Sequence, residues 1–154
     1  MNKLRRKDRA ITEEEAKVLL NKAEYGVLST VAENGTPYGV PLNFCIIDHC
    51  IFFHCALEGQ KLDNIKQNKS VSFCTVGNTE ILPDKFSTKY ESVIVSGEVD
   101  EVFDVNKQIA LEGLLHKYSP EFIDKGIKYI KGLDEKTRVF KIAVNKLTGK
   151  ARKQ

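Results

Sequence analysis

The hydrophobic residues between Ala16 and Ala23 are spaced three and four positions apart, as on one face of an α-helix. Thr12 precedes this stretch, and Glu15 lies three positions after Thr12. Together they form the capping-box pattern, in which a hydroxyl and a carboxylate satisfy free backbone amides at the start of a helix. The pattern predicts a short amphipathic helix that begins just after Thr12.

From Tyr25 onward the period changes to two, which is typical of strands. Two alternating segments, residues 25–32 and 36–44, flank Asn34 and Gly35. Both of these residues tolerate the positive backbone angles of a two-residue turn, so the segment predicts a β-hairpin. Ile46 and Ile47 then lead through a tight turn at residues 48–49 into the next strand. Further strands are predicted over residues 50–55, 71–76, 91–102 and 138–144.

Three more helices are expected: one that begins after Gly59, and two over residues 104–118 and 120–131. Ser119 is the expected cap of the last helix, with Pro120 in its first turn. Gly97 lies inside the long strand 91–102 and suggests a bulge or a close approach to another chain segment. Residues 77–90 are long for a loop in a compact domain, and we interpret them as a flap packed on a site or on a partner subunit.

About six strands joined by short connections, with helices at the ends, predict an antiparallel sheet curled into a barrel, in the α+β or mainly β class. The length of 154 residues fits a single domain over residues 1–154. The sequence contains neither the glycine-rich Rossmann fingerprint nor the P-loop motif, which argues against a nucleotide site of those two kinds.

The charge balance of 24 Lys and Arg against 21 Asp and Glu is too even to predict a nucleic-acid-binding surface. Basic residues gather at both ends of the chain, where we expect solvated tails. The apolar runs are far shorter than the roughly 20 residues that span a bilayer, and no signal peptide is recognisable. No membrane association and a cytoplasmic location are therefore expected.

Four cysteines, at positions 45, 50, 55 and 74, lie in or beside strand-like segments without a C-x-x-C pair. In the cytoplasm such residues are expected as buried reduced thiols. With a tight turn at residues 48–49, Cys45, Cys50 and His54 would face one side of the strands and Cys55 the other. This arrangement and the absence of a common zinc spacing lead us to expect no metal site.

The segment Glu58-Gly59-Gln60-Lys61 joins a strand to a helix and has two possible interpretations. The first amides of a helix lack internal partners and lie at the positive end of its dipole, so they attract an anion. A lysine there is mildly unfavourable unless an anion binds beside it, and Gly59 would permit close approach of a ligand. The other interpretation is a surface lysine beside an ordinary turn glycine, with His54 a half-buried strand residue.

Three blocks carry a resemblance to a known family: YGVLSTVAENGTPYGVPLNF, FFHCALEGQKLDNIKQN and YESVIVSGEV. In this order they resemble the flavin-binding split-barrel family related to pyridoxamine 5'-phosphate oxidase, most closely its nitroimidazole-resistance branch. The resemblance runs from about Arg5 to the C-terminal segment 148–152. It implies a six-stranded Greek-key split barrel and a homodimer with two FMN molecules at the subunit interface.

The resemblance also implies positions for the cofactor. Lys61 and the backbone near Gly59 would hold the FMN phosphate, Ala56 would be a further cofactor-binding residue, and His54 would lie near the flavin. The ring would lie along one strand and meet a segment of the second subunit; these residues are Val40, Pro41, Leu42 and Asn43 in the strand and Glu91 and Ser92 in the second subunit. The closing arginine- and tryptophan-containing motif of pyridoxamine 5'-phosphate oxidase is missing, and the chain has no Trp, so oxidation of pyridoxamine phosphate is not expected.

The resulting hypothesis is an FMN-dependent reductase of a small planar nitroaromatic substrate such as a 5-nitroimidazole. His54 is the candidate catalytic residue, as proton donor or substrate anchor, because an ordinary histidine pKa of about 6.5 allows proton transfer near neutrality. Two alternatives remain open: a carrier or sensor without turnover that holds flavin or haem in the same barrel, and a dimerisation module without a cofactor.

Overall fold

The computed structural model describes residues 3–153, so residues 1, 2 and 154 of the expected domain 1–154 lie outside it. The chain forms eight strands, four α-helices and three short 3₁₀-helices over this range. The helices are α1 Glu13–Lys22, α2 Gln60–Gln67, α3 Asp104–Tyr118 and α4 Ile123–Leu133, with 3₁₀ turns at Lys7–Arg9, Pro83–Lys85 and Asp134–Lys136. The strands are β1 Gly26–Val31, β2 Pro37–Leu42, β3 Cys45–Ile47, β4 Cys50–Cys55, β5 Ser70–Val76, β6 Glu80–Leu82, β7 Ser87–Val102 and β8 Arg138–Arg152.

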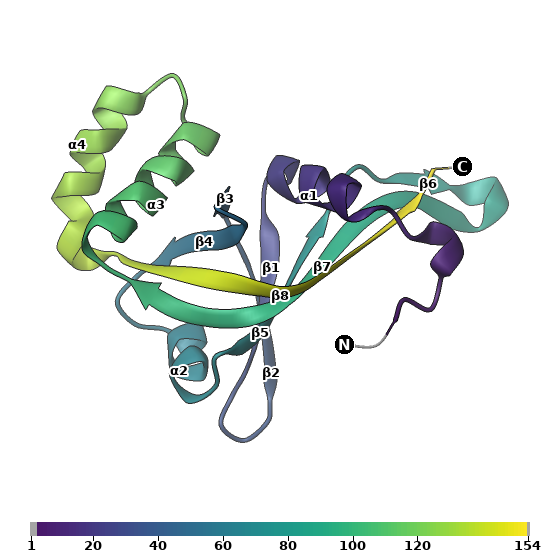
Figure 1. The fold of residues 1–154 in the computed structure, drawn as a ribbon, viewed down its shortest axis with the longest axis horizontal. Coiled ribbons are helices and arrows are strands. Elements are labelled where there is room, and N and C mark those ends of the chain that lie inside the picture. Colours follow the sequence, from purple (N-terminus) through teal and green to yellow (C-terminus); the bar gives the residue numbers. More distant parts are fainter. Residues whose placement is uncertain (1–2, 154) are drawn as a thin grey trace.

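All strand pairs are antiparallel, in the order β2-β1-β5-β7-β8-β4-β3, with β6 added to β7. The long strands β7 and β8 cross the molecule, with α3 and α4 side by side at one end and β6 at the other (Figure 1). The α+β class with a mainly antiparallel sheet is therefore confirmed. Within residues 3–153 the path of pairing ends at β2 and β3 and does not close into a barrel. Pro37 and Pro41 lack a backbone N–H, which limits the ladder that the free edge of β2 can form.

The predicted start of α1 is confirmed. The Thr12 hydroxyl accepts a hydrogen bond from the Glu15 amide at 3.1 Å, and the Glu15 carboxylate accepts one from the Thr12 amide at 3.2 Å. The side chains of Ala16, Leu19 and Leu20 are buried against the sheet. Local sequence chemistry thus determines where this helix begins and which face it buries.

The β1–β2 hairpin is confirmed, but its connection is longer than the predicted two-residue turn. The ladder ends at the Val31–Pro37 pair, and the Ala32 amide donates to the Thr36 carbonyl across the loop. Gly35 has a positive φ of 88°, whereas Asn34 does not and instead accepts a hydrogen bond from the Thr36 amide at 3.1 Å through its side chain. The asparagine therefore stabilises the loop by its side chain.

Two strands are longer than predicted, and residues 3–153 form eight strands and not the predicted six. β7 begins at Ser87 and not at residue 91, and β8 continues past residue 144 to Arg152, so most of the basic C-terminal segment is strand and not tail. Residues 145–152 are largely polar, so no hydrophobic alternation marks them; pairing with β7 over the Tyr90–Arg152 register makes them a strand. The short β3 and β6 supply the two additional strands.

The predicted bulge at Gly97 is confirmed. The β7–β8 register shifts between Ser96 and Gly97, and a Cβ at Gly97 would collide with the Ala143 carbonyl oxygen. Only glycine allows the two backbones to approach this closely.

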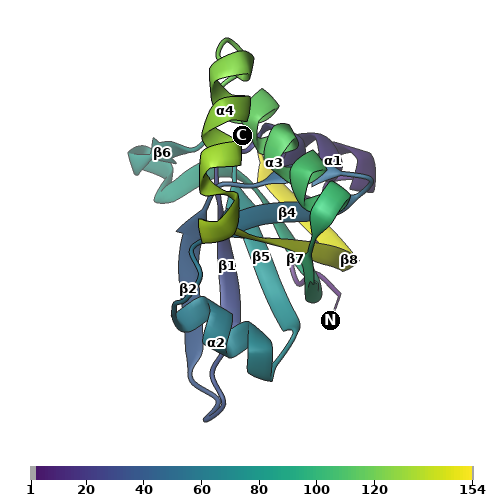
Figure 2. The same cartoon turned by 90° about the vertical axis from the view of Figure 1, so that its left-hand side faces the viewer.

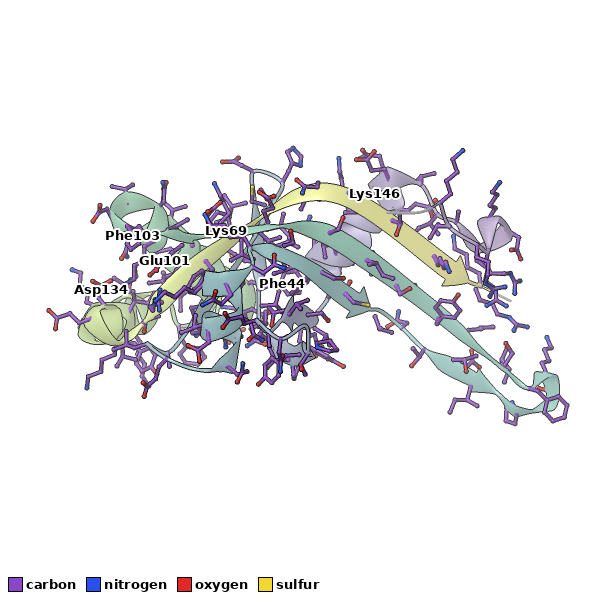
Figure 3. The ribbon with its side chains drawn as sticks, turned by 90° about the horizontal axis from the view of Figure 1, so that it is seen from below. Phe44, Lys69, Glu101, Phe103, Asp134 and Lys146 are labelled. Carbon is purple, nitrogen blue, oxygen red and sulfur yellow. The ribbon has the colours of Figure 1, made fainter. Side chains whose placement is uncertain are left out.

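Residues 77–90, interpreted above as a flap, form a hairpin in which β6 pairs with the start of β7. The hairpin extends the two long strands and projects away from the rest of the molecule (Figure 3). Its apolar side chains are exposed: Ile81 at 75% and Phe86 at 95%. It therefore does not cover a site of its own chain, although the expectation of a contact with a partner subunit stays a prediction.

β4 separates two hydrophobic clusters, as the alternation predicted. Ile51, Phe53 and Cys55 join the main core, whereas Phe52 lies with Cys45 in a second cluster beneath α3. Cys50 packs against that second cluster. The four thiols are free, and burial raises the pKa of Cys45 to about 11, with the Lys117 ammonium opposing the increase.

The prediction for α3 is confirmed, whereas α4 begins three residues later than predicted. The Ser119 side chain caps no amide; its carbonyl accepts a turn hydrogen bond from the Phe122 amide. The two helices pack closely because Gly126 lacks a side chain, and a Cβ there would collide with Leu115.

Candidate functional site

The β4–α2 connection places the start of a helix beside the end of a strand. Gly59 precedes α2 with φ 154° and ψ 168°, a conformation that is essentially restricted to glycine. The Leu62 and Asp63 amides donate to the Gly59 carbonyl, but no backbone acceptor within residues 3–153 receives the amides of Gln60 and Lys61. These two amides are therefore available to an anion at the positive end of the helix.

Lys61 adds a positive charge at this helix start. Its side chain is half-buried and forms no salt bridge with any of residues 3–153. Burial lowers the pKa of His54 and raises the pKa of Cys55; the Lys61 ammonium group adds to the first effect and opposes the second. Lys61 therefore lies near the end of β4, without a carboxylate to neutralise it.

His54 lies on β4, next to Val139 of β8, and faces a cavity of about 260 Å³. The His54 side chain is exposed to solvent, yet the protein atoms around it remove enough water to lower its pKa. The positive charge of Lys61 lowers the pKa further. No side chain within residues 3–153 forms a hydrogen bond with the ring. At neutral pH the imidazole is therefore largely uncharged, with both ring nitrogens free to contact a ligand.

The cavity beside His54 lies between the end of the sheet and the α3–α4 pair. Asn43 and His54 contribute polar groups from the sheet, and most of the remaining wall is apolar. The other residues that line it are Leu111, Leu114, Leu115, Tyr118, Ser119, Gly126, Tyr129, Ile130, Leu133 and Thr137. A small, flat and mostly apolar molecule with one or two polar groups matches such a lining.

The candidate flavin strand, β2, turns its residues to alternate sides. Val40 and Leu42 pack against the main core, whereas Pro41 and Asn43 are exposed. β2 pairs with β1 alone among the strands of residues 3–153, so one backbone edge is free. Val40 and Leu42 turn their side chains toward the core, so Pro41 and Asn43 are the residues of this segment whose side chains can meet a ligand.

A salt bridge fixes the loop between β4 and α2. Arg138 donates to both carboxylate oxygens of Glu101, at 2.6 and 3.1 Å, and also to the Leu57 carbonyl at 3.4 Å. The hydrogen bond to Glu101 raises the pKa of Arg138. Ala56 is exposed within the loop that this contact holds. Arg138 and Glu101 carry no signal in the sequence, because the groups that they contact are distant in the chain.

A second set of contacts fixes the segment that follows β2. The Tyr118 hydroxyl donates to the Glu24 carbonyl at 2.6 Å and accepts from the Phe44 amide at 3.1 Å. Lys117 donates to the Phe44 carbonyl at 2.8 Å and lies 3.7 Å from the centre of the Phe44 ring. The C-terminal end of α3 thus holds the residue next to Asn43. Nothing in the sequence pattern indicated this role for Lys117 or Tyr118.

Among the predicted site residues, Asn43 and His54 line one cavity, and Lys61 acts on His54 from the adjoining helix. Glu91 and Ser92 are not brought to this place. They pair with Ala151 and Lys150 of β8, and Glu91 lines a hollow beside α1. A single chain therefore assembles only part of the predicted site.

Among residues 3–153, no three His, Cys, Asp or Glu side chains come together so that they could hold a metal ion. No helix in the described part of the chain is long and apolar enough to cross a membrane.

Comparison with known proteins identifies the family of the chain. A family model described as pyridoxamine 5'-phosphate oxidase matches residues 12–151. A search of curated proteins finds no match.

Three solved structures share the fold at low sequence identity. One, from Bacteroides thetaiotaomicron, is provisionally named a 5-nitroimidazole antibiotic resistance protein; it is 21% identical over 92% of this chain and 85% of its own, with a TM-score of 0.74. A FAD-binding protein from Mesorhizobium loti is 21% identical over 94% and 97%, with a TM-score of 0.67. A protein from Mycobacterium smegmatis described as binding FAD and haem is 15% identical over 93% and 72%, with a TM-score of 0.77.

Proposed function

Because this chain belongs to the pyridoxamine 5'-phosphate oxidase family, we propose that it is an FMN-binding flavoprotein that reduces small nitroaromatic compounds. The observation that carries the proposal is the meeting of three elements at one end of the sheet. These are the free edge of β2, the cavity beside His54 and the positive start of α2 with Lys61. The edge of β2 and the start of α2 would hold the ring and the phosphate of FMN, and the cavity would hold the substrate.

The phosphate fits the start of α2. The free amides of Gln60 and Lys61 and the unpaired Lys61 ammonium form a cationic site, and a Cβ placed on Gly59 would meet no atom within 4 Å, so the approach is open. A dianion there would neutralise a charge that is otherwise unfavourable at a helix N-terminus. Arg138 contributes by holding the preceding loop through Leu57.

The ring system fits the edge of β2. Free backbone groups along this edge can hydrogen-bond the ring nitrogens and oxygens, while Pro41 offers a flat apolar contact. When bound, the flavin would supply the electron transfer that no protein side chain here provides. The role of the chain is to bind and orient the ring and to place a substrate next to it.

His54 would contact the substrate at the mouth of the cavity. Reduction of a nitro group consumes protons as well as electrons, and the imidazole can donate a hydrogen bond or, in its protonated form, a proton. The lowered pKa favours the neutral form at pH 7, so His54 would act there chiefly as a hydrogen-bond donor and positioning group. The similarity to the Bacteroides thetaiotaomicron structure supports the choice of a 5-nitroimidazole as the first substrate to test.

A homodimer would complete the site. Glu91 and Ser92 of the partner subunit would reach the flavin, since the same residues of one chain lie near α1 and not near His54. The exposed Ile81 and Phe86 of the projecting hairpin support an interface, because large apolar side chains this exposed are typically covered by a partner.

A second function is a carrier or sensor that holds flavin or haem without turnover. The observation that favours it is a largely neutral His54 with free ring nitrogens, which is the form that binds haem iron. The Mycobacterium smegmatis structure described as binding FAD and haem has the same fold.

One experiment separates the two functions. The purified chain is reconstituted with FMN, reduced under anaerobic conditions with dithionite, and mixed with a 5-nitroimidazole. The reductase predicts that the oxidised flavin spectrum returns as the nitro compound is consumed. A flavin that stays reduced contradicts turnover, and retention of haem with a Soret band supports the carrier.

A further inference from the structure

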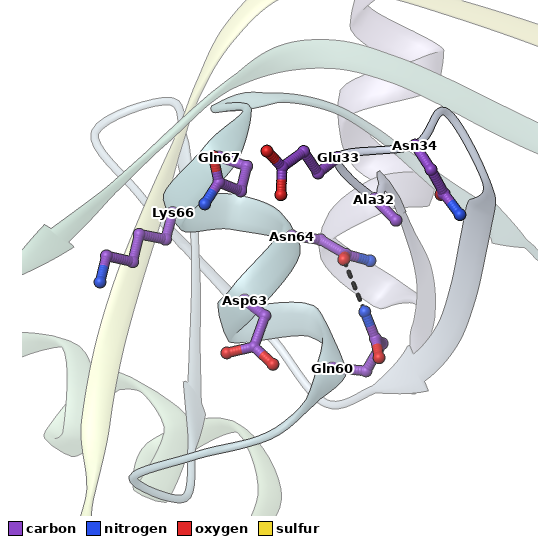
Figure 4. Close-up of a pocket in the computed structure, with 8 residues that line it drawn as sticks. All are labelled: Ala32, Glu33, Asn34, Gln60, Asp63, Asn64, Lys66 and Gln67. Carbon is purple, nitrogen blue, oxygen red and sulfur yellow. Dashed lines mark hydrogen bonds between the residues drawn. The ribbon is translucent and has the colours of Figure 1, made fainter.

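The cavity beside His54 differs in charge from a larger hollow of the same chain. The larger hollow, of about 580 Å³, lies between α2 and the loop that joins β1 to β2, and Glu33, Asp63 and Lys66 line it (Figure 4). Among residues 3–153, none that lines the cavity beside His54 is an aspartate, glutamate, lysine or arginine. A charged group inside it would lose its hydration without gaining a partner, so this cavity favours an uncharged ligand.

Two ammonium groups lie near this cavity without lining it. In the proposed function, Lys61 is neutralised by the phosphate of FMN. Lys117 directs its ammonium group to Phe44: it donates to the carbonyl at 2.8 Å and lies 3.7 Å from the centre of the ring. The His54 imidazole is itself largely uncharged at neutral pH. A carboxylate placed in the cavity would therefore meet neutral groups.

The helix α4 forms the outer wall of the cavity. Figures 1 and 2 show it outermost at its end of the molecule, beside α3. No residue of α4 is buried, although its apolar residues Ile130 and Leu133 line the cavity. A ligand in the cavity would cover apolar surface that the chain alone leaves partly exposed, and this burial favours an apolar ring.

Two contacts fix the distance between α4 and α3, and with it the size of the cavity. A Cβ at Gly126 would collide with the Leu115 side chain, so the two helices meet there without a further side chain between them. Lys107 of α3 donates to the Asp134 carbonyl at 2.8 Å and lies 3.3 Å from its carboxylate. Leu115 and Gly126 also line the cavity. The Leu115 side chain therefore limits the space that a ligand can occupy.

The size of the cavity is small for a binding site. Its volume of about 260 Å³ lies below the range of about 300–1,000 Å³ that is usual for pockets of drug-sized ligands. A single aromatic ring with a nitro group is compatible with such a space, whereas a fused ring system requires more of it.

We infer that the α3–α4 pair selects neutral, single-ring nitroaromatic compounds, and that Leu115 and Gly126 set the size limit. The inference rests on the proposed function, because it takes the cavity to be the substrate site of the flavin reductase. Anionic compounds are excluded because the cavity offers no countercharge, and fused-ring compounds because the Leu115 side chain occupies the space that they need.

The selection by charge is tested with para-nitrobenzamide and para-nitrobenzoate, which are similar in size and differ in charge. The full-length chain is loaded with FMN and reduced anaerobically with one equivalent of dithionite, and the rate of flavin reoxidation is measured. Each rate constant is divided by that of free reduced FMN, which removes the intrinsic reactivity of the compound. We expect the ratio of amide to carboxylate to be at least about tenfold. Tyr129→Lys, at an exposed position of the cavity wall, should lower this ratio at least about threefold.

The selection by size is tested with nitrobenzene and nitronaphthalene in the same assay. Leu115→Ala should raise the rate for nitronaphthalene relative to nitrobenzene about tenfold, and Leu115→Val should give a smaller increase if the alanine variant does not fold. Gly126→Ala should lower both rates, because Leu115 must then move into the cavity. The double variant Leu115→Ala/Gly126→Ala should recover them, since the new Cβ then has room. The control Lys128→Ala, exposed on α4 and outside the cavity lining, should change neither rate.

Binding of the four compounds to the flavin-free chain, measured by isothermal titration calorimetry, separates this inference from the proposed function. Tighter binding of the neutral single-ring compounds without reduction by the FMN-loaded chain supports the selectivity of the cavity and contradicts the reductase. Equal binding and equal corrected rates for all four compounds overturn the inference and leave the reductase standing. Selectivity that the variants of Leu115 and Tyr129 do not change also overturns it, because the substrate then lies elsewhere.

Discussion

Partial burial lowers the pKa of His54, and the ammonium group of Lys61 lowers it further, although the two residues lie on different elements, β4 and α2. The two side chains therefore share one electrostatic environment. This relationship links the proposed phosphate site to the cavity where a substrate would bind, because an anion that neutralises Lys61 also changes the charge state of His54.

Lys61→Ala should weaken FMN binding by about 10- to 100-fold, because a charge-assisted hydrogen bond contributes roughly 1.5–3 kcal/mol. The measurement is the dissociation constant of FMN, from fluorescence quenching. Lys66→Ala, on the same helix, removes an equal charge outside the proposed FMN phosphate site and should have a much smaller effect. Equal losses in both variants would show that only the overall charge matters.

An NMR titration of His54 should give a midpoint below the ordinary value of about 6.5, since partial burial and Lys61 both disfavour the protonated ring. The midpoint should increase in Lys61→Ala and on addition of FMN, because each removes or neutralises the positive charge. An unchanged midpoint in Lys61→Ala would mean that the two groups do not interact.

The lowered pKa of His54 also determines how the free energy of unfolding changes with pH. A histidine with a lowered pKa in the folded state binds its proton more tightly in the unfolded state, so the free energy of unfolding decreases as the pH falls below the ordinary histidine pKa. His54→Gln should reduce this loss between about pH 7 and 5. Urea denaturation at several pH values measures it, and parallel curves for the wild type and the variant would contradict the expectation.

Gly59→Ala should lower the free energy of unfolding by about 1–3 kcal/mol, because the backbone conformation at this position is restricted to glycine. The matched control is Gly132→Ala in α4, where a Cβ also meets no atom within 4 Å but the backbone is helical. That control should be stabilising by about 0.5–1 kcal/mol. Equal effects of the two substitutions in chemical denaturation would exclude backbone strain at Gly59.

Tyr118→Phe should destabilise the chain by about 1–2 kcal/mol, because it removes the hydroxyl that joins Glu24 to Phe44. It should also weaken FMN binding, since Phe44 adjoins Asn43. Tyr129→Phe is the control: Tyr129 is 70% exposed, and its change in stability should stay within about 0.5 kcal/mol. A Tyr118→Phe variant with unchanged stability and FMN affinity would contradict the assigned role.

Much of the fold could be predicted because its signals are local. The capping box at Thr12, the hairpin at Gly35 and the bulge at Gly97 each depend on a few neighbouring residues. The end of β8 could not be predicted, because its polar residues become a strand only by pairing with β7. The short β6 was hidden in the same way within residues 77–90.

The candidate site likewise contains residues with a local sequence signal and residues without one. Asn43, His54 and Lys61 were found from sequence blocks that resemble a family, and the structure places them near one another. The residues that hold them, Arg138 and Tyr118, act on backbone groups 81 and 74 positions away. Contacts of that range leave no periodic or short-motif signal in a single sequence.

The central claim is that the start of α2 binds the phosphate of a flavin. The most direct test compares the full-length wild type with Lys61→Ala. Each protein is incubated with FMN, unbound ligand is removed by gel filtration, and the visible spectrum of the protein is recorded. The account predicts that the wild type retains stoichiometric flavin and that the variant loses most of it. A wild-type chain that emerges colourless, or a variant that retains flavin equally well, would contradict the account.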